Sequence, residues 1–194
     1  MAQNPVKPIR GPSADGLAAA VGLAARKGPP PVHLWNPDYC GDLDIEIRRD
    51  GQWFYLGTPI GREALVKLFA SILKLEDGRY YLVTPVEKVG IRVEDVPFIA
   101  VDAEAVGEGA AQVLTFTTNV GDQVLANADA RIRVVRDPDT GEPSPYVHVR
   151  RGLEARIDRK TFYRLVDLGR HRDGWFGLWS AGQFFPIIPS AELG

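Results

Sequence analysis

The sequence has a single cysteine, Cys40, and only three histidines, His33, His148 and His171. One cysteine cannot form an intramolecular disulfide, and secreted domains usually use cysteines in pairs, so we expect the protein in the reducing cytoplasm. Structural zinc sites need several cysteines or histidines at short spacings, which these widely separated residues do not offer. We therefore expect no metal and no other cofactor.

The chain also lacks a long apolar run and an excess of charge of either sign. Its longest apolar run, residues 17–25, has about half the length that spans a bilayer. Asp15 before the run and Arg26-Lys27 after it are not typical of a signal peptide. With 23 basic and 25 acidic residues the net charge is −2, which is too little to hold duplex nucleic acid or an anionic membrane unspecifically. We expect neither as a partner, whereas a local basic site stays open.

The composition is that of a globular protein, because 45% of the 194 residues are hydrophobic. We predict an α+β protein with mostly antiparallel sheets in three parts. Residues 1–31 form a poorly ordered, proline-containing arm with a short helix, capped by Ser13 and ending at Arg26-Lys27. Residues 32–106 form the first α+β domain and residues 107–194 the second.

The first domain begins with a predicted hairpin around Asp50-Gly51. A two-residue turn there sets Ile47 opposite Phe54 on a core face. It also places Trp53 and Tyr55 among charged residues on the other face. That second face is either covered by another element or used as a contact surface.

Two segments of the chain indicate a duplication. Thr58-Pro59 predicts the start of a helix, and Ile60-Gly61-Arg62 aligns with Ile157-Asp158-Arg159 before a second helix at an offset of 97 residues. Asp77-Gly78 matches Asp173-Gly174 at an offset of 96. Two matches in the same order favour two related strand–helix–strand units, although amphipathic helices also resemble one another by chance. Further strands are expected at 80–84, 89–93, 98–101, 113–117, 123–126, 132–135, 146–149 and 153–157.

Arg62 and Arg159 would hold matching places in the first turns of the two helices, where the helix dipole disfavours a cation. Each arginine either forms a salt bridge with a nearby carboxylate or joins the helix N-terminus in an anion site. Arg150, just before the second helical unit, would add to such a site.

Other candidate residues have a plain structural interpretation beside the functional one. Thr84, Glu87 and Lys88 follow a strand and either bind a ligand or simply end the strand at Pro85. Acidic residues at positions 42, 44 and 46 are typical of a solvated strand face. Cys40 is a nucleophile only with an activating base beside it, which the sequence does not place.

Five motifs in this order together resemble an uncharacterised bacterial family, the domain of unknown function 1285. They are Asn36-Pro37-Asp38-Tyr39-Cys40-Gly41, Asp50-Gly51-Gln52-Trp53, Thr58-Pro59-Ile60, Thr84-Pro85-Val86-Glu87-Lys88 and Pro145-Tyr146-Val147-His148-Val149-Arg150. The resemblance runs from about residue 34 to about residue 168. It implies a duplicated α+β core whose second domain is a partly barrel-like sheet with one main helix, superficially like a pleckstrin-homology domain. It also implies a nucleotide-like ligand between the halves and a signalling role, but no enzymatic activity.

These observations predict a non-catalytic binding module with a small anionic, nucleotide-like ligand in the cleft between the two domains. Tyr146 and the hairpin aromatics would stack on a base while arginines take phosphate. The predicted ligand-binding residues are Trp53, Tyr55, Arg62, Thr84, Glu87, Lys88, Tyr146, Arg150 and Arg159. The alternatives are an adaptor that binds a protein partner through the same aromatics, and a hydrolase of small phosphorylated compounds.

Overall fold

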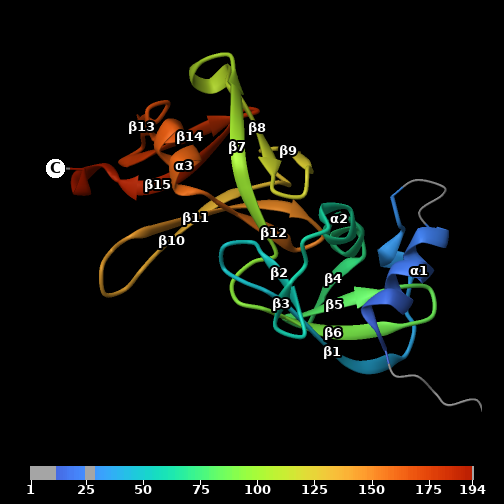
Figure 1. Ribbon diagram of the computed structural model, residues 1–194. Coiled ribbons are helices and arrows are strands. Elements are labelled where there is room, and N and C mark those ends of the chain that lie inside the picture. Colours follow the sequence, from blue (N-terminus) through green and yellow to red (C-terminus); the bar gives the residue numbers. More distant parts are fainter. Residues whose placement is uncertain (1–11, 25–28, 194) are drawn as a thin grey trace, which may run out of the picture. The chain divides into compact units, whose positions relative to one another are not determined.

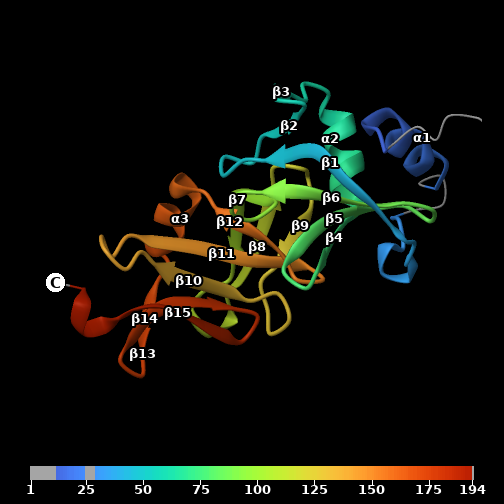
Figure 2. The same ribbon diagram turned by 90° about the horizontal axis from the view of Figure 1, so that it is seen from below.

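The computed structural model describes residues 12–24 and 29–193. They form an α+β structure of two similar units, as the sequence predicted (Figures 1 and 2). The first unit holds the described residues up to Glu46 together with Trp53–Arg92. The second holds Ile47–Gln52 and the chain from Val93 onward. The boundary that we placed after residue 106 coincides with the end of strand β7, which spans Phe98–Val106.

The first helix, α1, spans Ala14–Ala24. Ser13 caps it, since its Oγ accepts a hydrogen bond of 3.2 Å from the Gly16 N–H, as predicted. Leu17 and Val21 are fully buried, and the helix packs against α2, Glu63–Ser71. The predicted arm before residue 12 and the predicted helix end at Arg26-Lys27 lie outside the described residues.

A six-stranded sheet in the order β3-β2-β1-β6-β5-β4 forms the body of the first unit. Its strands are β1 (Tyr39–Ile47), β2 (Trp53–Tyr55), β3 (Thr58–Pro59), β4 (Leu73–Glu76), β5 (Arg79–Val83) and β6 (Lys88–Val93), preceded by the short helix η2 (Val32–Leu34). The predicted helix start at Thr58-Pro59 is wrong. Leu56 and Gly57 both have positive φ and turn the chain back, so that Thr58 and Pro59 pair with β2 and the helix begins four residues later.

The predicted register of the first hairpin is also wrong. The Arg48 N–H bonds to the Gln52 carbonyl oxygen at 2.9 Å, which leaves a loop of three residues rather than two. Gly51 takes the left-handed conformation, with φ 82°, that ends such a loop. The shift of one residue moves Trp53 to the buried side, where it is 2% exposed.

The second unit contains a six-stranded sheet, β10-β11-β12-β7-β8-β9, that curls into a half-barrel, and a three-stranded sheet, β13-β14-β15. Within the described residues the pairing of β12 with β7 is parallel, and the other pairings of this unit are antiparallel. Apart from β7, the elements are η3 (Gly109–Ala111), β8 (Val113–Thr118), β9 (Gln123–Leu125), β10 (Ile132–Arg136), β11 (Pro143–Arg150), β12 (Leu153–Ile157), α3 (Arg159–Val166), β13 (Arg170–Arg172), β14 (Trp175–Ser180), β15 (Gln183–Pro189) and η4 (Ser190–Glu192). Each range of the second unit that was predicted as a strand contains a strand in the structure.

Ser180, at the end of β14, joins the two sheets of the second unit. Its buried hydroxyl accepts a hydrogen bond from the Leu114 N–H at 2.9 Å and donates one to the Ala126 carbonyl oxygen at 2.6 Å. The Gln112 side-chain amide adds a bond of 2.8 Å to the carbonyl oxygen of Trp179. These contacts satisfy backbone groups that the sheets leave unpaired at this junction.

The duplication is confirmed, with a constant offset of 96 residues. Arg172 pairs with Trp175 in the β13–β14 hairpin as Glu76 pairs with Arg79 in the β4–β5 hairpin. Both hairpins turn on Asp-Gly with positive φ at the two residues, which is the two-residue turn that this dipeptide favours. The helices keep the same offset, since α2 begins at Glu63 and α3 at Arg159. The offset of 97 that we predicted for the helices is wrong, and Arg62 corresponds to Asp158 rather than to Arg159.

Candidate functional site

Two predicted site residues of the first unit lie on strand β2. Trp53 stacks on Phe69 of α2, with ring centroids 6.4 Å apart and an interplanar angle of 26°. Helix α2 therefore covers this aromatic on the buried side of the hairpin, whereas the sequence placed it on the face with the charged residues. Tyr55, two residues on, is half-buried.

The remaining predicted residues of the first unit have local structural contacts. The buried Thr84 hydroxyl accepts hydrogen bonds from the Val86 and Glu87 N–H groups at 3.3 and 3.0 Å, so it shapes the turn between β5 and β6. Lys88 forms an ion pair of 2.9 Å with Glu76. Arg62 is exposed at the N-cap of α2. These contacts fit the structural interpretation that we set beside the functional one for the Thr84 loop.

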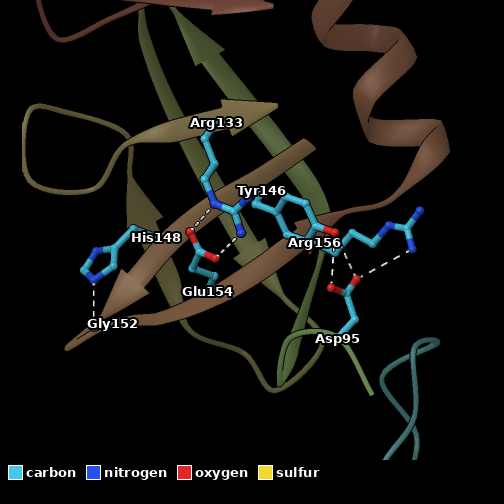
Figure 3. A network of polar contacts seen from close by, with 7 residues as sticks. All are labelled: Asp95, Arg133, Tyr146, His148, Gly152, Glu154 and Arg156. Atoms are coloured by element: carbon cyan, nitrogen blue, oxygen red, sulfur yellow. Dashed lines mark hydrogen bonds and ion pairs between the residues drawn. The ribbon is translucent and has the colours of Figure 1, made fainter. Parts of the chain in front are cut away.

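Tyr146 belongs to a polar network on the face of the half-barrel in the second unit (Figure 3). Its hydroxyl lies 3.1 and 3.2 Å from the two carboxylate oxygens of Asp95, which also pairs with Arg156 at 3.7 Å. Burial, followed by the Asp95 charge, raises the pKa of the Tyr146 hydroxyl above its ordinary value. Arg133 lies over the Tyr146 ring at 4.2 Å and makes a bidentate contact with Glu154.

Arg150 and His148, on the same strand β11, are held by the second unit itself. The Arg150 guanidinium pairs with Asp122 and lies over the Phe98 ring at 5.0 Å. The His148 Nε2 accepts the Gly152 N–H at 3.0 Å, which fixes the turn between β11 and β12 (Figure 3). Arg150 is therefore an ion-paired residue at the end of β11.

Arg159 is a predicted residue that lines a described cavity. The cavity has a volume of about 830 Å³ and is formed wholly by residues of the second unit around the N-terminus of α3. Arg156 from the end of β12 and Arg49 from the hairpin loop line it as well. The cavity is thus lined by three arginines, one from the hairpin loop and two from the end of β12 and the start of α3.

Local contacts orient these arginines. The Arg159 Nε donates a hydrogen bond of 3.1 Å to the Tyr163 hydroxyl, one turn along the helix. This bond raises the pKa of the Arg159 guanidinium above its ordinary value. Arg156 contacts Asp95 at 3.7 Å and the Ser144 hydroxyl at 3.4 Å. Tyr146 therefore supports the cavity indirectly, because it fixes Asp95, the partner of Arg156.

Three carboxylates also line the cavity, and two of them are engaged by backbone groups. Asp158 caps α3 by accepting the Thr161 N–H at 2.7 Å, and Asp50 accepts the Gln52 N–H at 3.0 Å. The third, Glu142, is close enough to Arg159 to contribute to its raised pKa. With three arginines and three carboxylates, the side chains that line the cavity carry no net formal charge.

The rest of the cavity wall is apolar or aromatic. It consists of Ile99, Val101, Pro143, Pro145, Ile157, Phe162 and the ring of Tyr163. Its described wall contains no serine, cysteine, histidine or lysine. Across the described ranges, no three His, Cys, Asp or Glu residues are placed to hold a metal ion.

The sequence interpretation missed Arg49, Arg156 and Glu142. Arg156 lies at an outward position of β12, between the buried residues Ala155 and Ile157 and two residues before the helix cap. Strand alternation therefore carried a signal for this residue. No sequence signal marked Arg49, because its position in the cavity wall depends on the three-residue loop of the first hairpin. The expectation of a ligand cleft between the two domains stays a prediction.

No helix in the described part of the chain has the length and apolar character needed to span a membrane.

Comparison with known proteins agrees with the two-unit organisation. The model of the DUF1285 N-terminal domain, a domain of unknown function, matches residues 30–96, and that of the DUF1285 C-terminal domain matches residues 97–187. No curated protein matches the chain.

Two crystal structures are similar to this chain. A DUF1285 family protein from Silicibacter pomeroyi DSS-3 is 65% identical, with a TM-score of 0.86 over 93% of this chain and 99% of that one. A DUF1285 family protein from Shewanella baltica OS155 is 34% identical, with a TM-score of 0.51 over 64% of this chain and 91% of that one. The resemblance stated from the motifs is confirmed, and the chain belongs to the DUF1285 family, whose function is unknown.

Proposed function

We propose that the chain is a non-catalytic binding module whose second unit binds a small anion of nucleotide-like size, with a role in signal transduction. The observation that carries the proposal is the position of Arg159 at the N-terminus of α3, inside a cavity of about 830 Å³. Cavities of about 300–1,000 Å³ are the usual size for small-molecule sites.

Charge supports an oxyanion as the bound group. The helix dipole places partial positive charge at the N-terminus of α3, where the Asp158 carboxylate already accepts the Thr161 N–H. Arg159 brings a guanidinium to the same end of α3, and Arg156 brings a second from β12. A helix N-terminus combined with guanidinium groups is a good receptor for a phosphate or carboxylate.

The wall of the cavity supports a ligand that also has a non-polar part. Phe162 and Tyr163 follow Arg159 on α3, and Pro143 and Pro145 face the cavity from β11. Such a wall removes apolar ligand surface from water, which adds affinity beyond the charge interaction. An inorganic ion alone would leave this surface unused.

The hydrolase alternative has less support. The Cys40 thiol is exposed and donates to the carbonyl oxygen of Asp38 at 3.3 Å rather than to a catalytic base. The adaptor alternative stays a prediction.

The proposal is tested by titrating the protein with inorganic phosphate, AMP, ADP and cyclic nucleotides, with calorimetry and thermal shift as readouts. The substitution Arg159→Met is expected to weaken binding about 10- to 100-fold, the usual loss for a hydrogen bond to a charged group. Arg164→Met is the matched control, because Arg164 lies on the same helix but pairs with Asp102 and does not line the cavity. Equal losses in the two variants, or no binding of any anion to the unmodified protein at millimolar concentration, would overturn the proposal.

A further inference from the structure

A second, smaller cavity of the same unit adjoins the arginine-lined one. It has a volume of about 160 Å³, and Pro143 and Phe162 line both cavities. Its other walls come from the end of α3, from β14 and β15, and from the residue after η4. Examples are Val166, Phe176, Ile188 and Leu193. The two cavities therefore share two wall residues, a proline and a phenylalanine.

The two cavities differ sharply in polarity. Three arginines line the larger one, whereas Arg136 is the one charged side chain among the described residues that line the smaller one. Arg136 is already engaged, since it pairs with Glu192 and donates to the Gly141 carbonyl oxygen at 3.3 Å. The smaller cavity thus offers an apolar lining and no unengaged charge.

We infer that the ligand is an anionic amphiphile with a short unbranched alkyl chain, whose oxyanion binds at Arg159 and whose chain enters the smaller cavity. This inference rests on the function proposed above and narrows the class of ligand. A nucleobase fits the smaller cavity poorly, because its polar edges would lose their water partners there without gaining others. An alkyl chain loses no hydrogen bonds on entry.

The volume of the smaller cavity limits the length of the alkyl chain that it can hold. A methylene group occupies about the volume of a water molecule in the liquid, about 30 Å³. A cavity of about 160 Å³ therefore takes about five carbons. This length favours a free, short-chain phosphate or carboxylate over the long acyl chains of membrane lipids.

The test is a series of n-alkyl phosphates from methyl to octyl, and the carboxylates of the same lengths, titrated by calorimetry below their micelle concentrations. In the unmodified protein each added methylene is expected to lower Kd by up to about fourfold, as burial of one such group predicts. The gain should stop after about five carbons, when the cavity is full.

Two variants test binding of the alkyl chain separately from binding of the oxyanion. Val166→Phe fills the smaller cavity from α3 and is expected to abolish the dependence on chain length while methyl phosphate still binds. Ile188→Phe enters the same cavity from β15 and gives an independent check if the first variant folds poorly. Val106→Phe is the matched control, because Val106 is 70% exposed at the end of β7 and lines neither cavity.

The outcomes are distinguishable. If methyl phosphate binds but Kd does not change with chain length, the inference is wrong and the proposed function stands. The same holds if Val166→Phe and Ile188→Phe keep the full dependence on chain length. If neither the phosphates nor the carboxylates bind, the inference is wrong, and the titration with inorganic phosphate and nucleotides described above decides the proposed function. Sedimentation with phosphatidylglycerol vesicles is expected to leave the protein in the supernatant, and co-sedimentation without binding of the short amphiphiles would overturn the assignment to a free ligand.

Discussion

Thr84 and Ser180 occupy the same position in the two units, 96 residues apart, and both are fully buried. Their hydroxyls have different partners. Thr84 bonds to N–H groups of its own turn, whereas Ser180 bridges β8 and the residue after β9. The repeat thus keeps a buried hydroxyl but uses it locally in one unit and between sheets in the other.

Ser180→Ala is expected to destabilise the second unit by about 2–3 kcal/mol. The substitution leaves the Leu114 N–H and the Ala126 carbonyl oxygen buried without partners, and each such group costs about 1–3 kcal/mol. Urea unfolding gives the free energy difference. Ser71→Ala is the control, because Ser71 is half-buried and donates to a carbonyl of its own helix. A loss below that of the control would contradict the bridging role.

Gly51→Ala should cost more than Gly57→Ala, although both glycines have positive φ. A Cβ at Gly51 would lie 2.6 Å from Ile99 Cγ1 and 2.9 Å from Asn119 Nδ2, while nothing lies within 4 Å of a Cβ at Gly57. The backbone penalty of about 1 kcal/mol is common to both, and steric overlap adds about 1–2 kcal/mol at Gly51. Thermal unfolding of the two variants measures the difference. Equal losses of stability in the two variants would show that the three-residue loop accommodates the added methyl group without steric overlap.

Glu142→Gln is expected to tighten binding of phosphate or carboxylate ligands by several-fold. Glu142 lines the cavity near Arg159 and repels an oxyanion bound there. The gain should shrink as salt is raised from about 10 mM to 1 M, since screening weakens the repulsion. Glu104→Gln, an exposed change on β7 that lines neither cavity, provides the control for net charge. Weaker binding in Glu142→Gln would mean that Glu142 contacts the ligand as an acceptor.

Glu76 should make the stability of the first unit depend on acid pH. Ion pairs with Lys74 and Lys88, at 2.6 and 2.9 Å, lower the pKa of the Glu76 carboxyl below its ordinary value of 4.5. Because the folded state has the lower pKa, this stabilisation is present above about pH 4.5 and is lost as pH falls through the lowered pKa.

Glu76→Gln is therefore expected to cost about 1 kcal/mol at neutral pH and progressively less in acid. Urea unfolding between pH 3 and pH 7 measures this dependence. Glu63→Gln removes a carboxylate that is largely exposed and should change stability little. A constant cost of Glu76→Gln across the pH range would rule out the ion pairs as its cause.

Much of the fold could be predicted from the sequence, because local patterns determine it. Alternation of buried and exposed residues marked the strands of the second unit, and Ser13 marked the start of α1. The Asp-Gly pairs at 77–78 and 173–174 fixed the duplicated hairpins. The same dipeptide failed at Asp50-Gly51, where the Arg49 N–H bonds to Glu94, a contact 45 residues away, in a loop of three residues. A tertiary contact of this kind has no local sequence signal.

The candidate site could be predicted only in part. Arg159 lines the cavity, and Tyr146 supports it through Asp95, whereas Arg150 pairs with Asp122. The assumed equivalence of Arg62 and Arg159 failed through a one-residue error in the offset. Side chains that reach the cavity from the hairpin loop and from β11 are brought there by the half-barrel, which sequence spacing does not reveal.

The constant offset of 96 residues also has a consequence for folding. The strand pairs of β4–β6 recur with the same register at the matching residues of β13–β15, although β14–β15 also has a register shift between Phe176 and Gly177. Identical registers allow strand exchange between repeats, a known route to misassembly. The contacts that prevent exchange must therefore lie outside the repeated pattern. Ser180, with its bonds to Leu114 and Ala126, is one residue by which the chain distinguishes its second copy from its first.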